Sequence, residues 1–157
     1  MVPKSLREEI QQTKPFESLE QEAVLNILRT ADQLHRSSQQ MLKEHDLTGS
    51  QYNVLRILRG AGPDGLRSSE IGNRMVSHDP DITRLLDRLD RSKLIKRRRC
   101  EQDRRVIYAS ITSVGLELLK ELDPLIKRQG KIQMGHMSRQ SLEELVHLLE
   151  EVRGRGE

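Results

Sequence analysis

Six basic side chains gather within one short stretch of the chain, Lys96-Arg97-Arg98-Arg99 and Arg104-Arg105. Strand-like runs predict a β-hairpin here, with residues 94–99 and 106–112 as its strands and residues 100–105 as its tip. Arginine at a hairpin tip suits insertion into the minor groove of DNA, where the potential is most negative. The alternative is a solvated basic strand edge that discourages aggregation. That alternative explains one or two lysines better than six basic residues.

The positive charge of the chain is concentrated around this hairpin. Residues 67–105 contain twelve Lys/Arg against seven Asp/Glu, a local net charge of +5. The whole chain contains 27 against 24, a net charge of +3, so the remainder carries −2. A basic patch confined to one segment is the electrostatic footprint of a nucleic-acid reader.

A helix just before the hairpin is expected to supply contacts with the bases. Asp79-Pro80 predicts its start, because Asp caps helices and Pro at the first helical position loses no needed donor. Its apolar residues recur three and four apart and form one buried face: Ile82, Leu85, Leu86 and Leu89. The residues expected near DNA are Ser77, His78, Asp79, Asp81, Thr83, Arg84 and Arg88.

Arg84 is the best candidate for a bidentate contact with guanine. Alternatively, Arg84 and Arg88 form intrahelical ion pairs with Asp81 and Asp87. The two interpretations are compatible, because a paired arginine can still reach DNA. Asp79 and Asp81 are unfavourable near phosphates, so they either cap the helix or accept from cytosine amino groups.

A shorter helix, capped by Ser68 or Ser69, precedes this one. Its Ile71 and Met75 are expected to interlock with Ile82 and Leu85 of the longer helix. Gly72 is expected where only a small residue lets the two helices approach closely. Two such helices followed by a hairpin predict a winged helix-turn-helix, whose second helix enters the major groove.

The segments on either side, residues 16–46 and 113–153, predict long amphipathic helices. A capping box at Ser18 to Gln21 starts the first of them, and Ser138 or Ser141 caps the last helix. With 34% apolar and 32% charged residues, a monomer would have a thin core. We therefore expect the apolar stripes of these helices to pair with a second copy of the chain.

Composition argues against several other classes of protein. Aromatic residues make up only 2% of the chain, which disfavours single-strand binding on stacked platforms. No run has the length of a signal peptide or a membrane span, so a cytoplasmic protein without membrane contact is expected. The histidines lack ligand spacing and a catalytic set is absent, so no metal, cofactor or enzyme activity is expected. The single cysteine, Cys100, is expected to be an incidental thiol rather than a redox switch.

These patterns resemble the MarR family of bacterial transcriptional regulators over nearly the whole chain. The matching pieces begin with Leu47-Thr-Gly-Ser-Gln-Tyr-Asn-Val-Leu55 and Ser69-Glu-Ile-Gly72. They continue with Asp81-Ile-Thr-Arg-Leu-Leu-Asp-Arg-Leu89, Asp103-Arg-Arg105 and Ile111-Thr-Ser-Val-Gly115. Two positions depart from the family pattern. Lys93 stands where glycine is common before the wing, which implies slight strain or another turn. Arg67 stands at a cap where threonine is frequent.

The resemblance implies a mainly α fold with a small β-hairpin wing, in which residues 47–112 form a winged helix-turn-helix lobe. Residues 16–46 and 113–153 would form a helical dimerisation lobe of the same single domain, 1–157. Such proteins are homodimers that bind palindromic double-stranded DNA, usually as repressors, and many respond to a small molecule. By the same resemblance, Asp103 orients Arg105 into the minor groove, with Arg98 and Arg104 beside it.

A small-molecule effector in such proteins binds between the dimer-forming helices and the DNA-binding lobe. The residues expected to line that cleft are Leu34, Met41, Tyr52, Leu55 and Arg56, which could equally belong to the core. The alternative function is a dimeric helical interaction protein whose basic wing binds a protein or RNA partner.

Overall fold

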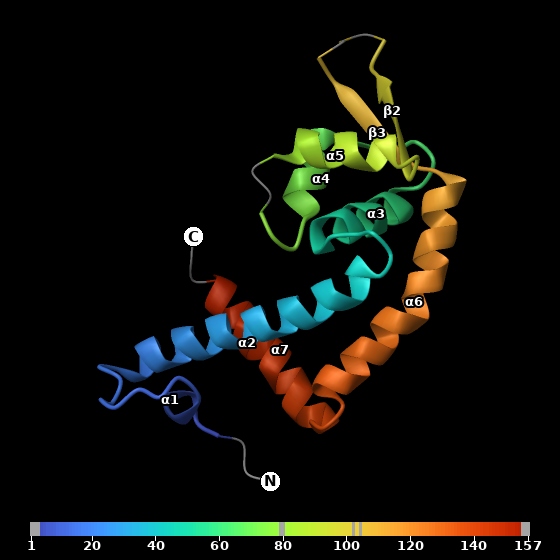
Figure 1. The fold of residues 1–157 in the computed structure, drawn as a ribbon. Coiled ribbons are helices and arrows are strands. Elements are labelled where there is room, and N and C mark those ends of the chain that lie inside the picture. Colours follow the sequence, from blue (N-terminus) through green and yellow to red (C-terminus); the bar gives the residue numbers. More distant parts are fainter. Residues whose placement is uncertain (1–3, 79–80, 102, 104, 155–157) are drawn as a thin grey trace. The chain divides into compact units, whose positions relative to one another are not determined.

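The computed structural model describes residues 4–78, 81–101, 103 and 105–154. Its packing divides the chain into two compact units, Met1–Gly49 and Ser50–Glu157. The structure is mainly helical and contains one small antiparallel sheet, as predicted (Figure 1).

The first unit contains α1 (Leu6–Glu9) and the long helix α2 (Leu19–Lys43). Ser18 caps α2, because its Oγ accepts a hydrogen bond from the Gln21 amide at 3.2 Å. Gln21 reaches one residue further back than predicted, since its Oε1 accepts from the Glu17 amide at 2.9 Å. Within α2 the buried residue is Leu42. Its large exposed apolar residues are Leu19, Val24, Ile27 and Leu28.

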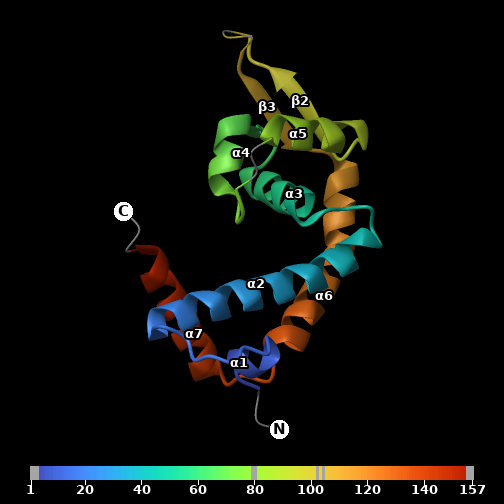
Figure 2. The same cartoon turned by 60° about the vertical axis from the view of Figure 1, so that its left-hand side comes forward.

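The second unit contains nearly all of the predicted winged helix-turn-helix lobe, residues 47–112, and the whole chain after it. Its elements are α3 (Gly49–Ala61), β1 (Leu66–Arg67), α4 (Ser68–Arg74), α5 (Ile82–Arg91), β2 (Ile95–Arg99), β3 (Ile107–Ile111), α6 (Ser113–Met134) and α7 (Arg139–Gly154). Figures 1 and 2 both show α5 lying against the base of the β2–β3 hairpin, with which it makes contact. The core of the second unit receives fully buried side chains from each of its helices except α7. They include Leu55, Leu58, Ile71, Leu86, Leu89, Ile95, Leu119 and Leu122.

The sheet has three strands in the order β1-β3-β2, whereas the sequence predicted only the β2–β3 hairpin. The extra strand β1 pairs with β3, with Leu66 opposite Ala109. Gly65 permits this pairing. It has φ +74°, and a Cβ there would lie 2.2 Å from the carbonyl oxygen of Ala109. A two-residue strand is too short to show any alternation in the sequence.

The start of α6 is attached to the base of the wing. Oγ1 of Thr112 donates a hydrogen bond to the Lys93 carbonyl at 2.7 Å and accepts one from the Gly115 amide at 3.1 Å. A Cβ on Gly115 would lie 2.4 Å from the Leu94 carbonyl oxygen, so the two segments are in direct backbone contact. Lys93 itself has φ +60°, which confirms the strain predicted for a non-glycine residue at that turn.

Candidate nucleic-acid interface

The helix expected to read bases, α5, begins at Ile82. Asp81 caps it, since its Oδ1 accepts a hydrogen bond from the Arg84 amide at 3.0 Å. The predicted start at Asp79-Pro80 is therefore wrong by two residues, and those two positions lie outside the described residues. Asp79 and Asp81 have the same capping chemistry, and Asp81 directly precedes the first apolar position of the helix.

The two faces of α5 separate as the apolar spacing predicted. Leu85, Leu86 and Leu89 are buried, and Ile82 is half-buried. The opposite face is solvent-exposed and carries Thr83, Arg84 and Arg88; Ser77 and His78, which precede the helix, are exposed as well. The predicted base-reading residues that the structure describes are thus all exposed, including the capping residue Asp81.

Arg97 ties the wing to this helix. Its Nη1 lies 2.5 Å from Oδ1 of Asp87, and its Nε donates to Oδ2 of Asp90 at 3.2 Å. Asp87 therefore pairs across to β2, rather than within α5 to Arg84 or Arg88 as the alternative interpretation held. Arg97 is thus paired within the protein, whereas Lys96, Arg98, Arg99 and Arg105 are exposed to solvent.

The wing tip is shaped by Asp103. Its Oδ1 accepts a hydrogen bond from the Arg105 backbone amide at 2.9 Å, and its carbonyl accepts from the Val106 amide at 3.0 Å. The Asp103 side chain therefore acts on Arg105 through the turn of the backbone. Arg105 is exposed, and Arg104 lies outside the described residues.

Arg98 is exposed on β2 and stacks over the ring of Tyr108, with 5.3 Å from its guanidinium carbon to the ring centroid. Tyr108 was not among the predicted site residues. Strand alternation could have found it, because Tyr108 lies directly opposite Arg98 in the sheet register.

Comparisons with known proteins agree with this geometry. A sequence model described as the MarR family matches residues 45–106. The MarR transcription factor from Planctomyces limnophilus is 39% identical and has a TM-score of 0.69; the match covers 87% of this chain and 98% of that one. The chain belongs to the MarR family.

Two further proteins extend the comparison. The homoprotocatechuate degradative operon repressor of Escherichia coli is 28% identical over 111 residues, which are 71% of this chain and 74% of that protein. The structure of the S. aureus MepR–DNA complex has a TM-score of 0.76 at 22% identity, over 84% of this chain and 96% of the other. At that identity the likeness establishes the fold alone.

In this MarR-family chain Arg67 occupies the cap of α4, as the family resemblance implied, and the prediction of Ser68 or Ser69 is wrong. The Arg67 amide donates to Oε2 of Glu70 at 3.0 Å. A Cβ on Gly72 would meet no atom within 4 Å, so the prediction that only a small residue fits there is wrong.

Asn53 of α3 was also missed, although it positions the connection between the two motif helices. Its Oδ1 accepts a hydrogen bond from the Val76 amide at 2.8 Å. Nothing in the sequence distinguishes Asn53 from any other polar residue on α3, since its partner lies 23 residues further along the chain.

The predicted effector residues lie on α2 and α3. Leu55 is fully buried and belongs to the core. Leu34, Met41 and Tyr52 are half-buried, and exposed Arg56 lies 5.9 Å from the centroid of the Tyr52 ring. Burial is the main cause that raises the pKa of Tyr52 above its ordinary value. Apart from Leu55, this set stays a prediction.

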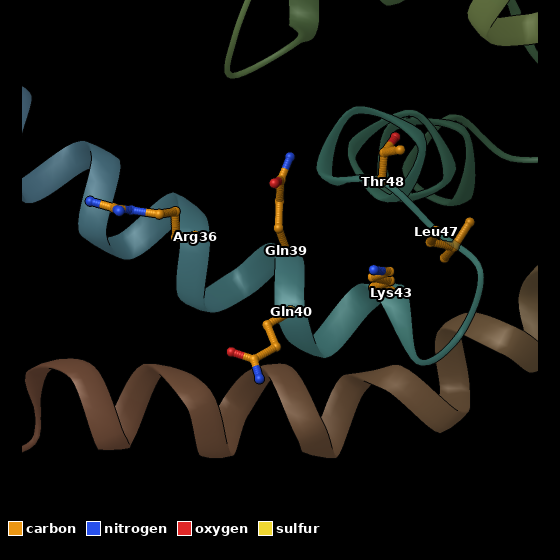
Figure 3. A pocket seen from close by; sticks show the side chains of 6 residues that line it. All are labelled: Arg36, Gln39, Gln40, Lys43, Leu47 and Thr48. Atoms are coloured by element: carbon orange, nitrogen blue, oxygen red, sulfur yellow. The ribbon is translucent and has the colours of Figure 1, made fainter.

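A hollow of about 530 Å³ lies along the C-terminal half of α2 and the segment that follows it. Figure 3 shows its lining side chains, with Gln39 and Gln40 extending from α2 in opposite directions. None of the predicted effector residues lines it; its lining residues are Arg36, Gln39, Gln40, Lys43, Leu47 and Thr48.

Among the described residues, His, Cys, Asp and Glu side chains form no group of three or more that could hold a metal ion. Within the same part of the chain, no helix combines the length and the apolar character needed to cross a membrane.

Proposed function

We propose that this MarR-family regulator binds a palindromic double-stranded operator as a homodimer and represses transcription from it. One observation carries the proposal. The exposed face of α5, with Thr83, Arg84 and Arg88, is joined through Arg97 to a wing that presents Arg98 and Arg105. A helix of this kind reads base edges in the major groove while the wing follows the adjacent minor groove.

The homodimer is supported by apolar side chains that a single chain leaves exposed. No residue of α7 is buried, and its Val146, Leu148 and Val152 are 55%, 49% and 61% exposed. On α2, Leu19 and Leu28 are 78% and 60% exposed. A second copy that covers these surfaces would also bring two copies of α5 to two half-sites, as a palindrome requires.

Repression is supported by the relative from Escherichia coli, which is named as an operon repressor. A response to a small-molecule effector is part of the proposal and follows from the family resemblance. Release of bound duplex by compounds from a chemically diverse library would test that response. If no compound changes the amount of duplex bound per amount of folded protein, the effector response is absent.

Selection from a random duplex library tests the main proposal. The wild-type protein is expected to enrich a palindrome and to bind it more tightly than a scrambled duplex of equal length. Arg84→Ala is expected to reduce this preference by about 1–3 kcal/mol, because a bidentate base contact is lost. His147→Ala, on an exposed residue of α7, is the control.

The alternative function, a wing that binds RNA or protein, makes a different prediction. It expects Arg105→Ala to leave duplex affinity unchanged, whereas a minor-groove contact expects a clear loss. Enrichment of no palindrome, together with unchanged duplex affinity for Arg105→Ala, would refute the proposed function.

A further inference from the structure

The outer face of the small sheet holds two arginines against one tyrosine. Tyr108 of the central strand β3 lies opposite Arg67 of β1 on one side and opposite Arg98 of β2 on the other. Their guanidinium carbons lie 5.7 Å and 5.3 Å from the Tyr108 ring centroid. The face of an aromatic ring attracts cations, so the ring holds both arginines in place.

Arg67 has a second contact that fixes its direction. Its Nε donates a hydrogen bond to the Tyr108 hydroxyl at 3.1 Å. This bond uses Nε alone, so the two terminal nitrogens can still donate to a ligand. A side chain that is ordered before a ligand arrives loses less conformational entropy when it binds.

Arg67 also lines a hollow of about 330 Å³ in the second unit. Arg105 of the wing lines it too, and hydroxyls come from Ser68 and Ser69 of α4 and from Thr83 of α5. Its described lining residues include two arginines and three residues that carry a hydroxyl, and none that carries a carboxylate. This set of donors suits an oxyanion with several acceptor oxygens.

We propose that this hollow receives one backbone phosphate of the DNA, with Arg67 as its cationic contact and Tyr108 as the positioning residue for Arg67. The inference rests on the proposed function. It follows from where the hollow lies. Thr83 belongs to the helix assigned to the major groove, and Arg105 to the wing assigned to the minor groove. The ridge that separates the two grooves of a duplex is the phosphate backbone, so a hollow between these two elements faces a phosphate.

A phosphate contact has a signature that a base contact lacks, because it changes the salt dependence of binding to every sequence. The probe is a duplex of arbitrary sequence without a palindrome, titrated over a series of salt concentrations. Arg67→Gln is expected to reduce the slope of log K against log salt by about 0.9 and to weaken binding at 0.1 M salt about eightfold. Arg128→Gln removes the same charge from an exposed position on α6 and is expected to change neither quantity.

Tyr108→Phe tests the positioning role, since it keeps the ring and removes only the hydroxyl. We expect an affinity loss of about two- to threefold with an unchanged salt slope, and no further loss when the variant is combined with Arg67→Gln. If Tyr108→Phe lowers duplex affinity equally in the wild type and in Arg67→Gln, or lowers it in neither, the role given to Tyr108 is overturned.

The same titrations separate this inference from the function on which it rests. If the wild-type protein does not bind duplex, the proposed function fails. If it binds and Arg67→Gln keeps the wild-type slope, only the phosphate site is overturned. Thermal melting of each variant, read by circular dichroism, ensures that folded protein is compared with folded protein.

Discussion

Arg97 of β2 and Asp87 of α5 form an ion pair between the wing and the helix proposed to read bases, with 2.5 Å between Nη1 and Oδ1. Asp90, one turn further along α5, shares the same guanidinium through Nε at 3.2 Å. The Arg97 side chain is 27% exposed and the two carboxylates are 37% and 38% exposed, so solvent screens these contacts only in part. One side chain thus links the wing to two carboxylates on successive turns of α5.

Arg97→Met is therefore expected to lower the free energy of unfolding by about 1–2 kcal/mol, because two half-buried carboxylates lose their partner. Urea denaturation measures the change. Lys96→Met, on an exposed neighbour in the same strand, is the matched control and should stay within about 0.5 kcal/mol of the wild type. Equal stability of the two variants would mean that the ion pair contributes nothing to the fold.

Asp103 offers a test that separates hydrogen bonding from charge. Its Oδ1 accepts from the Arg105 amide, and an asparagine oxygen can accept in the same way. We expect Asp103→Asn to keep duplex affinity within about twofold, and Asp103→Ala to weaken it about tenfold as the turn is lost. Fluorescence anisotropy with a labelled duplex gives both values. Equal losses in the two variants would show that the negative charge, and not the turn, is what matters.

Three glycines that look alike in the sequence should respond differently to alanine. Gly65→Ala and Gly115→Ala place a Cβ 2.2 Å and 2.4 Å from backbone oxygens, so each should destabilise the fold by more than about 2 kcal/mol. Gly72→Ala adds a methyl group to open space inside α4 and should stabilise it by about 0.5–1 kcal/mol. Thermal melting of all three variants checks the order. If Gly72→Ala instead lowers the melting temperature, that result would support the predicted close approach of the two motif helices.

The exposed apolar side chains of α7 predict the effect of a charge on oligomeric state. Val152→Glu is expected to shift the protein from dimer to monomer, because a carboxylate would have to be desolvated in the interface. Size-exclusion chromatography with light scattering reports the mass. His147→Glu introduces the same charge at an exposed polar position of α7 and should remain dimeric. Val152→Glu that elutes as a dimer would exclude this part of α7 from the interface.

Much of α5 could be predicted because its signal is local. The spacing of Leu85, Leu86 and Leu89 specifies a buried face without reference to any other element. Alternation of Ile107, Ala109 and Ile111 likewise predicted β3. Errors arose at the helix start, where Asp79 and Asp81 carry equal capping chemistry and only the surrounding chain decides between them.

The contacts that position the site were missed because their partners are distant in sequence. Arg97 looks like its neighbours Arg98 and Arg99, and only the pairing of β2 with β3 and the packing of α5 turn it toward Asp87. In the sequence, Gly65 resembles any other loop glycine. Only the structure shows that a Cβ there would lie 2.2 Å from the Ala109 carbonyl oxygen. Side-chain type was thus sufficient to predict the class of ligand, whereas the arrangement of the donors depends on tertiary structure.

The hydrogen bonds of Thr112 attach the first turn of α6 to the base of the wing. Because Thr112 and Gly115 join the first turn of α6 to the Lys93 and Leu94 carbonyls, a tilt of this helix carries the base of β2 with it. The helix is 22 residues long, about 33 Å at 1.5 Å per residue. We therefore expect a displacement at the far end of α6 to change the angle of the wing, and in the proposed dimer to change the distance between the two wings.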